Sequence, residues 1–276
     1  MKIVDFHIHI TRADQYNSWF LRWLEELGNI KEDPEEYLNK ILNSPKSLLS
    51  YLDSQSIHYA VCLAEDNPML TGTISNQEVA DFCSYSERLI PFANLNPYTV
   101  KDLRGELERC VEMGHQGLKL YPTYQHFYPN DSRLYPLYEK AQELGIPVMF
   151  HTGSSSFPGA KIKYGDPLFL DDVAVDFPNL TIIMSHAGRG FWYDKAFFLC
   201  KLHKKVYLDI TGLPPSRLLR YFPELEKISS KVVFGSDWPA IVDIKKNIEA
   251  IKALPISQDA RLNILGQNAI RLLALK

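Results

Sequence analysis

Short apolar runs alternate along the chain with longer segments of helical periodicity. Eight such runs cover residues 3–10, 59–65, 89–97, 117–122, 146–153, 180–188, 205–212 and 231–239. They lack a clean alternation of polar and apolar side chains, a pattern typical of parallel strands that are covered on both faces. The sequence therefore predicts eight buried strands with helices packed around them.

Helix start and stop signals lie between the strand-like runs. Ser75 and Glu78 have the spacing of a capping box, and apolar residues follow on one helical face. Another helical pattern, over residues 134–141, ends near Gly145, a residue type typical of helix ends. Eight strands alternating with helices favour an α/β fold, the (β/α)8 TIM barrel, over a doubly wound open sheet, which usually has fewer strands.

Two connections are unusually long. Residues 11–46, after the first run, are polar and aromatic and predict a helical insertion, and residues 122–133 follow the fourth run. Both leave the carboxyl ends of strands, where barrel active sites lie. We expect one domain over residues 1–276, with the insertion as a cap over the active-site face. The aromatic residues of the insertion, which have helical spacing, are interpreted as packing residues: Trp19, Phe20 and Trp23.

Composition narrows the function classes. The net charge of −3 and the lack of a Lys/Arg cluster argue against binding to nucleic acid or to an anionic membrane. No apolar run approaches the roughly 20 residues of a membrane span, and no signal-peptide pattern precedes the first run. The four cysteines are scattered in apolar contexts, so we expect reduced thiols in a cytoplasmic protein, with disulfides as the alternative.

Three polar residues interrupt the first apolar run at every second position: Asp5, His7 and His9. Because successive side chains of a strand point to opposite faces, we expect all three on the inner face of the barrel. Two imidazoles at this spacing can bind one metal ion. Asp5 lies one layer deeper, so we expect it to support a ligand rather than to bind the metal. Alone, the HxH pattern is a weak signal.

Other strand-like runs end in residues of the same kind. His151 ends the fifth run, His186 the sixth and Asp237 the eighth. The carboxyl ends of all barrel strands meet at one face. Four of the eight histidines of the chain occupy such positions, which favours a shared metal site over four unrelated core or surface histidines.

The motifs "DFHIH", "GLKLYP", "FHTG", "SHAG" and "GSDWP", in this order over the whole chain, resemble the amidohydrolase superfamily. They are most similar to its amidohydrolase-related branch, which includes aminocarboxymuconate-semialdehyde decarboxylase-like proteins. The resemblance implies four metal ligands: His7, His9, His151 and Asp237. It also implies that Asp237 takes a proton from water, and that His186 polarises the substrate, orients the water or binds a second ion. The expected cofactor is Zn²⁺ or another divalent ion such as Mn²⁺, and we favour one ion over two.

The resemblance does not decide the role of Lys119. Many members of the superfamily carry a carboxylated lysine on that strand, which bridges two metals. The alternatives are contact with a substrate carboxylate, support of the ligands or a structural ion pair. Tyr121, Tyr124 and Arg189 are further substrate-binding candidates, and Arg189 suits a carboxylate but can equally cap a surface helix. Weaker candidates are Asn94, Asn96, His126 and Trp192.

The leading hypothesis is a metal-dependent hydrolase that attacks an amide, lactone or ester carbon of a small, carboxylated substrate. A non-oxidative decarboxylase of the same branch is the first alternative. TatD-like and PHP-like phosphoesterases also begin with HxH, but we expect a basic groove there, and "FANLNP" lacks the TatD-like glutamate. A metal-binding protein without enzymatic activity is the last alternative. A homodimer is compatible with the sequence.

Overall fold

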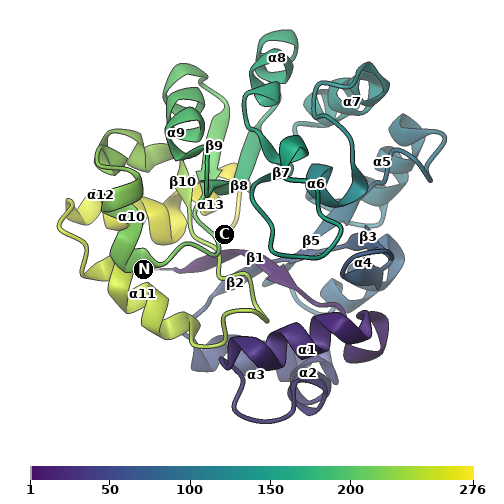
Figure 1. Cartoon of the computed structure of the whole chain (residues 1–276), viewed down its shortest axis with the longest axis vertical. Coiled ribbons are helices and arrows are strands. Elements are labelled where there is room, and N and C mark those ends of the chain that lie inside the picture. Colours follow the sequence, from purple (N-terminus) through teal and green to yellow (C-terminus); the bar gives the residue numbers. More distant parts are fainter. Residues whose placement is uncertain (1) are drawn as a thin grey trace.

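The computed structural model describes residues 2–276 and contains an eight-stranded sheet ringed by helices (Figure 1). Neighbouring strands of this sheet pair in parallel and follow their order in the chain. The strands are β1 (Val4–His9), β2 (Tyr59–Leu63), β5 (Leu89–Asn94), β6 (Gly117–Leu120), β7 (Val148–Gly153), β8 (Ile182–Arg189), β9 (Val206–Asp209) and β10 (Val232–Val233). Two short antiparallel strands stand apart: β3 (Glu65–Asn67) and β4 (Gly72–Ile74).

Helices follow the strands and form the outer layer. The α-helices are α1 (Ser18–Leu27), α2 (Pro34–Leu42), α3 (Pro45–Ser54), α4 (Asn76–Cys83), α5 (Leu103–Glu112), α6 (Pro122–Gln125), α7 (Tyr135–Leu144), α8 (Phe169–Asp176), α9 (Tyr193–Leu202), α10 (Leu218–Tyr221), α11 (Ile244–Lys252), α12 (Gln258–Leu262) and α13 (Asn268–Leu272). The 3-10 helices are η1 (Ala13–Gln15), η2 (Ser132–Leu134), η3 (Ile162–Gly165), η4 (Pro215–Arg217) and η5 (Leu225–Lys231), and η6 (Asn263–Gln267) is a π-helix. The predicted capping box of Ser75 and Glu78 begins α4, and Gly145 ends α7 with a φ of +68°.

The first and last strands meet and bring the sheet close to a closed barrel. The backbone N–H of Phe6 donates to the carbonyl of Phe234 at 2.8 Å, and that of His9 donates to Trp238 at 2.9 Å. The regular part of β10 is only two residues long, so this closure rests on the irregular segment that follows it. The architecture confirms the predicted (β/α)8 TIM barrel with a helical insertion after the first strand.

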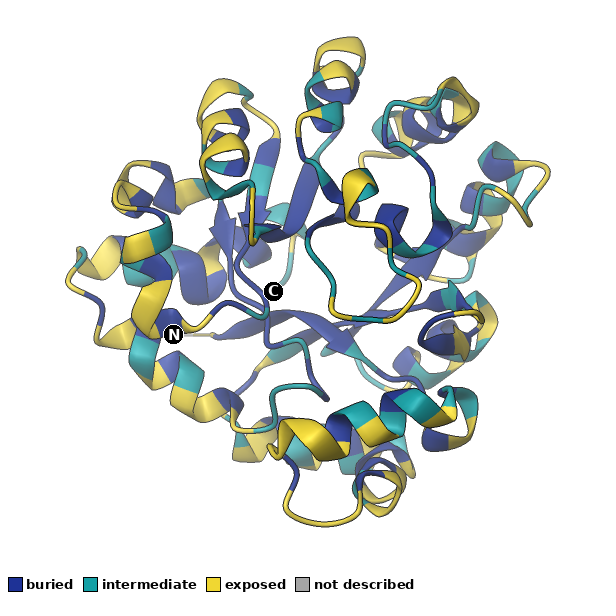
Figure 2. Ribbon diagram, in the orientation of Figure 1, coloured by how far each residue is buried: buried dark blue, intermediate teal, exposed yellow. Residues whose placement is uncertain are grey.

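The core has two parts, and the barrel strands are buried along most of their length (Figure 2). The smaller part fills the inside of the barrel and includes Ala269 of α13. Its strand residues are Val4, Phe6, Val61, Leu63, Ile90, Phe92, Met149, Ile183 and Val233. The larger part lies between the strands and the helices and includes Ile8 and Ile10. All four cysteines are buried and free, as expected for reduced thiols.

A bulge in β1 overturns one expectation. Between Asp5 and Ile8, β1 has one residue more than the paired stretch of β2. Asp5 pairs with Ala60, which belongs to the helix-facing core, whereas His9 pairs with Leu63 of the barrel interior. The prediction that Asp5 shares the inner face with His7 and His9 is therefore wrong, because the extra residue reverses the side-chain alternation.

The insertion after β1 forms η1, α1 and α2, which lie beside α3 at one side of the barrel (Figure 1). Asn17 fixes the start of α1: its backbone N–H donates to Thr71 at 2.9 Å, and its amide donates to the carbonyls of Pro68 and Leu70. The insertion is thus held by the turn between β3 and β4. Within residues 2–276, we find no helix long and apolar enough to cross a membrane.

Candidate metal centre

A cavity of about 180 Å³ lies at the carboxyl ends of the barrel strands. It brings together every residue of the predicted ligand set, and also Lys119, Tyr121, Tyr124 and Arg189. The cavity is lined by His7, His9, Tyr16, Phe20, Trp23, Glu65, Thr71, Lys119, Tyr121, Tyr124, His151, Ser154, Ser155, Ser156, Phe157, His186, Arg189, Asp237, Pro239 and Ala240. The weaker candidates Asn94, Asn96, His126 and Trp192 do not line it.

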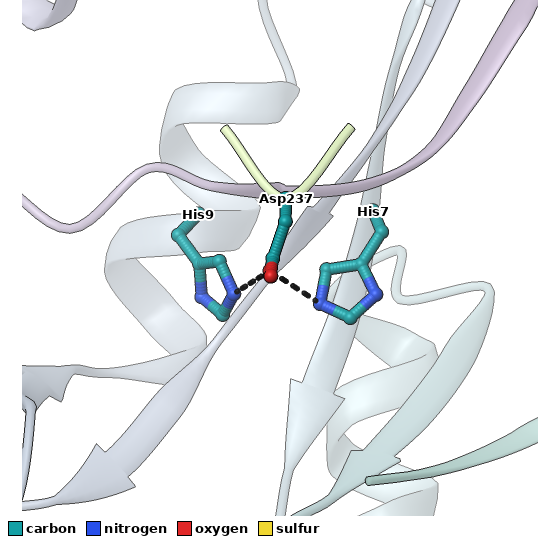
Figure 3. Close-up of side chains that lie close together, drawn as sticks. All are labelled: His7, His9 and Asp237. Atoms are coloured by element: carbon teal, nitrogen blue, oxygen red, sulfur yellow. Dashed lines mark ion pairs between the residues drawn. The ribbon is translucent and has the colours of Figure 1, made fainter. Parts of the chain in front are cut away.

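Three side chains form a compact group within the cavity (Figure 3). Nε2 of His7 and Nε2 of His9 each lie 3.5 Å from the same oxygen, Oδ1 of Asp237. One ligand atom from each of the three residues lies within 4.8 Å of the others, a spacing that can hold a metal ion. Two imidazoles and a carboxylate are ligands that Zn²⁺ and similar divalent ions accept.

An acceptor faces the outer nitrogen of three histidines, and two of these contacts are hydrogen bonds. Nδ1 of His7 lies 2.8 Å from Oδ2 of Asp209, and Nδ1 of His186 donates to the carbonyl of Thr211 at 3.1 Å. Nδ1 of His9 lies 3.6 Å from Oε2 of Glu65. With the proton on Nδ1, each ring keeps a lone pair on Nε2, the arrangement that metal-binding histidines adopt.

Three buried nitrogens of the site have no hydrogen-bond partner among the described residues: Nε2 of His7, Nε2 of His151 and Nδ1 of His9, which only faces Glu65. Buried polar atoms in folded proteins are normally paired, so unpaired imidazole nitrogens gathered at one cavity suit the binding of a metal ion. The rings of His151 and His186 lie 4.5 Å apart, which places His151 beside the same cavity. The donor set and its unpaired atoms therefore fit a divalent metal ion.

The electrostatics of the site keep most of the imidazoles neutral. Burial lowers the pKa of His7, His151 and His186 well below the usual value, and the nearby cations lower it further. Burial alone would also lower the pKa of His9, but Asp237 and Glu65 outweigh it and raise that pKa to about 9. Burial would raise the pKa of Asp237, but the histidines hold it well below its usual value. Asp237 is thus an ionised acceptor.

The backbone is strained where the site is built. His186, Ala187 and Asp237 have φ values of +61°, +46° and +68°. Residues other than glycine seldom adopt this left-handed region, and such strain concentrates at functional sites.

Asp5 supports the centre from outside the barrel. Its Oδ1 accepts the backbone N–H of His7 at 3.2 Å and that of Ser236 at 2.8 Å. These two bonds tie β1 to the segment that carries Asp237. Burial raises the pKa of Asp5 to about 7.

Lys119 is fully buried and lines the same cavity as the group of three. Its ammonium donates to Oγ of Ser185 at 2.9 Å and lies 5.1 Å from the centre of the Tyr121 ring. Burial lowers the pKa of Lys119 to about 8 and raises that of Asp209 to about 7, and each charge partly offsets the effect on the other. Lys119 therefore has partners, as a buried lysine requires.

Sequence reasoning missed Glu65 and Asp209. Asp209 ends β9, just as His151 and His186 lie near the ends of their strands, and the same positional signal applies to it. Glu65 follows β2 after one intervening residue. Both carboxylates face a histidine nitrogen rather than the centre of the group, a role that strand-end position alone does not reveal.

Comparisons with known proteins agree with this architecture. A family model described as amidohydrolase matches residues 4–275. A 2-keto-4-carboxy-3-hexenedioate hydratase of Sphingobium sp. is 35% identical over 122 residues, and the match covers 38% of this chain but only 36% of the hydratase.

Solved structures extend the comparison over the whole fold. An uncharacterised TIM-barrel protein of Bordetella bronchiseptica is 25% identical, with a TM-score of 0.83 and 99% of each chain covered. A 5-carboxyvanillate decarboxylase of Novosphingobium aromaticivorans, complexed with manganese and 4-hydroxy-3-methoxy-5-nitrobenzoic acid, is 14% identical, with a TM-score of 0.69 and coverage of 99% and 96%. The second likeness concerns the fold alone. Because the family model spans nearly all of the chain, the protein belongs to the amidohydrolase family.

Proposed function

We propose that this protein is a divalent-metal-dependent hydrolase that acts on a small, carboxylated molecule. The observation that carries the proposal is the group of His7, His9 and Asp237, whose ligand atoms lie within 4.8 Å of one another in the cavity. The manganese of the Novosphingobium decarboxylase supports a divalent ion in this fold. We expect one ion, Zn²⁺ or Mn²⁺.

His7, His9 and Asp237 would hold the ion, with His151 as the fourth ligand. When bound, a divalent ion of this kind lowers the pKa of water toward neutrality and polarises a carbonyl oxygen. The unpaired Nε2 atoms of His7 and His151 support this ligand set. His186 has no buried nitrogen without a partner, so we place it outside this ligand set.

Asp237 and His186 suit the proton transfers of hydrolysis. Asp237 is ionised and accepts a proton from the attacking water. His186 is neutral and presents Nε2 as an acceptor, so it can orient that water. The water oxygen bonds to the substrate carbon, the bond from that carbon to the leaving nitrogen or oxygen breaks, and the proton passes from Asp237 to the leaving group.

Arg189 is the expected partner of a substrate carboxylate. Its Nε and Nη2 donate to the carbonyl of Ser154 at 3.3 and 2.9 Å, which fixes the guanidinium at the cavity. The remaining N–H groups are free to bind an anion, and guanidinium matches a carboxylate well. The name of the Sphingobium hydratase, a hexenedioate enzyme, supports a carboxylated substrate.

The size and walls of the cavity limit the substrate. A cavity of about 150 Å³ accepts benzene, so one of about 180 Å³ suits a single ring or a short chain. Tyr124, Phe157 and Trp23 supply aromatic walls. We therefore expect a compact, planar acid.

Decarboxylation is the second candidate. It requires a proton donor for the substrate carbon, and the Lys119 ammonium lines the same cavity. The same ligand set would serve both reactions.

The test is product analysis on a panel of carboxylated lactones, amides, esters and hydroxybenzoates in water enriched in oxygen-18. We expect product with the label on the attacked carbon, lost after chelator treatment and restored by Zn²⁺ or Mn²⁺. Release of carbon dioxide, with no oxygen-18 in the organic product, would show that the enzyme is a decarboxylase and not a hydrolase. Turnover that survives complete metal removal would contradict both.

A further inference from the structure

Glu65 is a buried carboxylate that the proposed reaction does not use. Only 2% of its surface is exposed. Its Oε1 accepts hydrogen bonds from the Asn67 amide, at 3.0 Å, and from the Thr71 hydroxyl. Its other oxygen, Oε2, lies 3.6 Å from Nδ1 of His9. A buried carboxylate is costly unless its charge is compensated, and His9 is the group that Oε2 faces.

A rigid scaffold holds Glu65 in this orientation. β3 and β4 pair antiparallel, with Glu65 opposite Ile74. Gly72 of β4 packs so closely on the loop before α1 that a Cβ there would lie 2.3 Å from the carbonyl oxygen of Gln15. Because Asn67 and Thr71 belong to this ribbon and its turn, Oε1 is fixed by residues outside the group of three.

We propose that Glu65 is a positioning residue for the metal ligand His9. Its negative charge favours the imidazole tautomer with the proton on Nδ1, which leaves the lone pair of Nε2 directed toward Asp237. Asp209 stands in the same relation to His7. The two neighbouring ligands of β1 thus each have a carboxylate behind them, one from β9 and one from the β3–β4 ribbon. This inference rests on the proposed metal site.

Two other roles are open to a glutamate at this cavity: direct metal ligation and proton transfer to the substrate. The geometry favours positioning, because Oε2 faces the outer nitrogen of His9, and Glu65 is not part of the compact group formed by His7, His9 and Asp237.

The test is the dissociation constant for Zn²⁺, measured by competition with a chromophoric chelator on chelator-treated full-length protein. Glu65→Gln keeps an oxygen for Asn67 and Thr71 but turns an NH2 group toward Nδ1 of His9, which opposes the required tautomer. We expect Zn²⁺ binding to weaken about 10- to 100-fold. Asp66→Asn is the matched control. It also removes one negative charge from β3, but the Asp66 carboxylate accepts a hydrogen bond from the Thr99 hydroxyl and does not face His9. We expect its affinity to stay within about threefold of the wild type.

A second readout follows the tautomer itself. Histidine proton–nitrogen NMR of the Zn²⁺-loaded protein should report Nδ1–H for His9 in the wild type and in Asp66→Asn. If Glu65→Gln does not fold, Thr71→Val takes its place, because it removes one hydrogen bond to Oε1 without a change of charge. We expect a several-fold loss of affinity from Thr71→Val.

Unchanged Zn²⁺ affinity in Glu65→Gln with loss of turnover would overturn the inference and make Glu65 a proton-transfer group. Unchanged affinity in Thr71→Val, where that variant carries the test, would overturn it too. A wild-type protein that binds no divalent ion would instead refute the proposed metal enzyme, so the two failures are distinguishable.

Discussion

Nδ1 of His7 and Oδ2 of Asp209 lie 2.8 Å apart, and both side chains are fully buried. Asp209 Oδ1 accepts the backbone N–H of Thr211 at 3.0 Å, so the carboxylate cannot turn away from His7 without loss of that bond. The pair therefore fixes both the orientation and the tautomer of the first ligand of β1, 202 residues from Asp209 in the chain.

Asp209→Asn should weaken metal binding. An asparagine can present its NH2 group to Nδ1 of His7, and the support of the required tautomer is then lost. We expect the Zn²⁺ affinity to fall about 10- to 100-fold, as for other residues behind metal-binding histidines. The measurement is chelator competition, with the exposed Asp194→Asn as the control. Equal affinities of the two variants would contradict the assigned role of Asp209.

Arg189→Met should impair recognition of carboxylated substrates selectively. The variant keeps an unbranched apolar stem but loses the charged donors. A hydrogen bond between charged groups contributes about 1.5–3 kcal/mol, so KM should rise about 10- to 100-fold for the acid. The methyl ester of the same carboxylate should show little change. An equal loss for acid and ester would mean that Arg189 acts only through its bond to Ser154.

Phe157→Ala should loosen the aromatic wall of the cavity. The Phe157 ring lies 4.8 Å from that of Trp23 and 5.3 Å from that of Trp19. Removing it takes away apolar contact area worth about 1–3 kcal/mol, so we expect KM to rise about 5- to 100-fold. Ligand-induced changes in tryptophan fluorescence should shrink with it. The exposed Phe198 supplies the control Phe198→Ala, for which we expect neither change. Wild-type values for Phe157→Ala would mean that the ring does not contact substrate.

His115 should make the fold sensitive to acid. Burial lowers its pKa below the ordinary value, whereas the unfolded chain keeps that value near 6.5. As the pH falls through this range, the unfolded chain takes up a proton that the folded chain does not, so stability is full above it and is lost below. The side-chain amide introduced by His115→Gln can still donate to the carbonyl of Asn76, as Nε2 of the imidazole does at 3.0 Å if it carries the proton.

The measurement is urea unfolding of the metal-free protein near pH 8 and near pH 5.5. His115→Gln should lose less stability than the wild type between the two conditions. The buried histidines of the site contribute in both proteins alike, so a parallel loss would show that His115 adds nothing to the acid sensitivity.

Much of this picture follows from local patterns. The strand ends of β7 and β8 and the capping box of Ser75 are encoded by neighbouring residues, and the barrel follows from their repetition. The bulge in β1 could not be predicted, because one extra residue leaves no mark in an alternating run. Glu65 and Asp209 are two of 33 acidic residues, and only the fold shows which histidine each one faces.

Metal titration of the chelator-treated protein by calorimetry tests the central claim most directly. His9→Ala removes a member of the compact group, and His203→Ala removes a histidine that pairs with Asp171 elsewhere in the fold. We predict about one Zn²⁺ or Mn²⁺ ion per chain in the wild type and in His203→Ala, with binding severely weakened in His9→Ala. A wild-type chain that binds no ion, or a His9→Ala variant that binds one as tightly as His203→Ala does, would contradict the account.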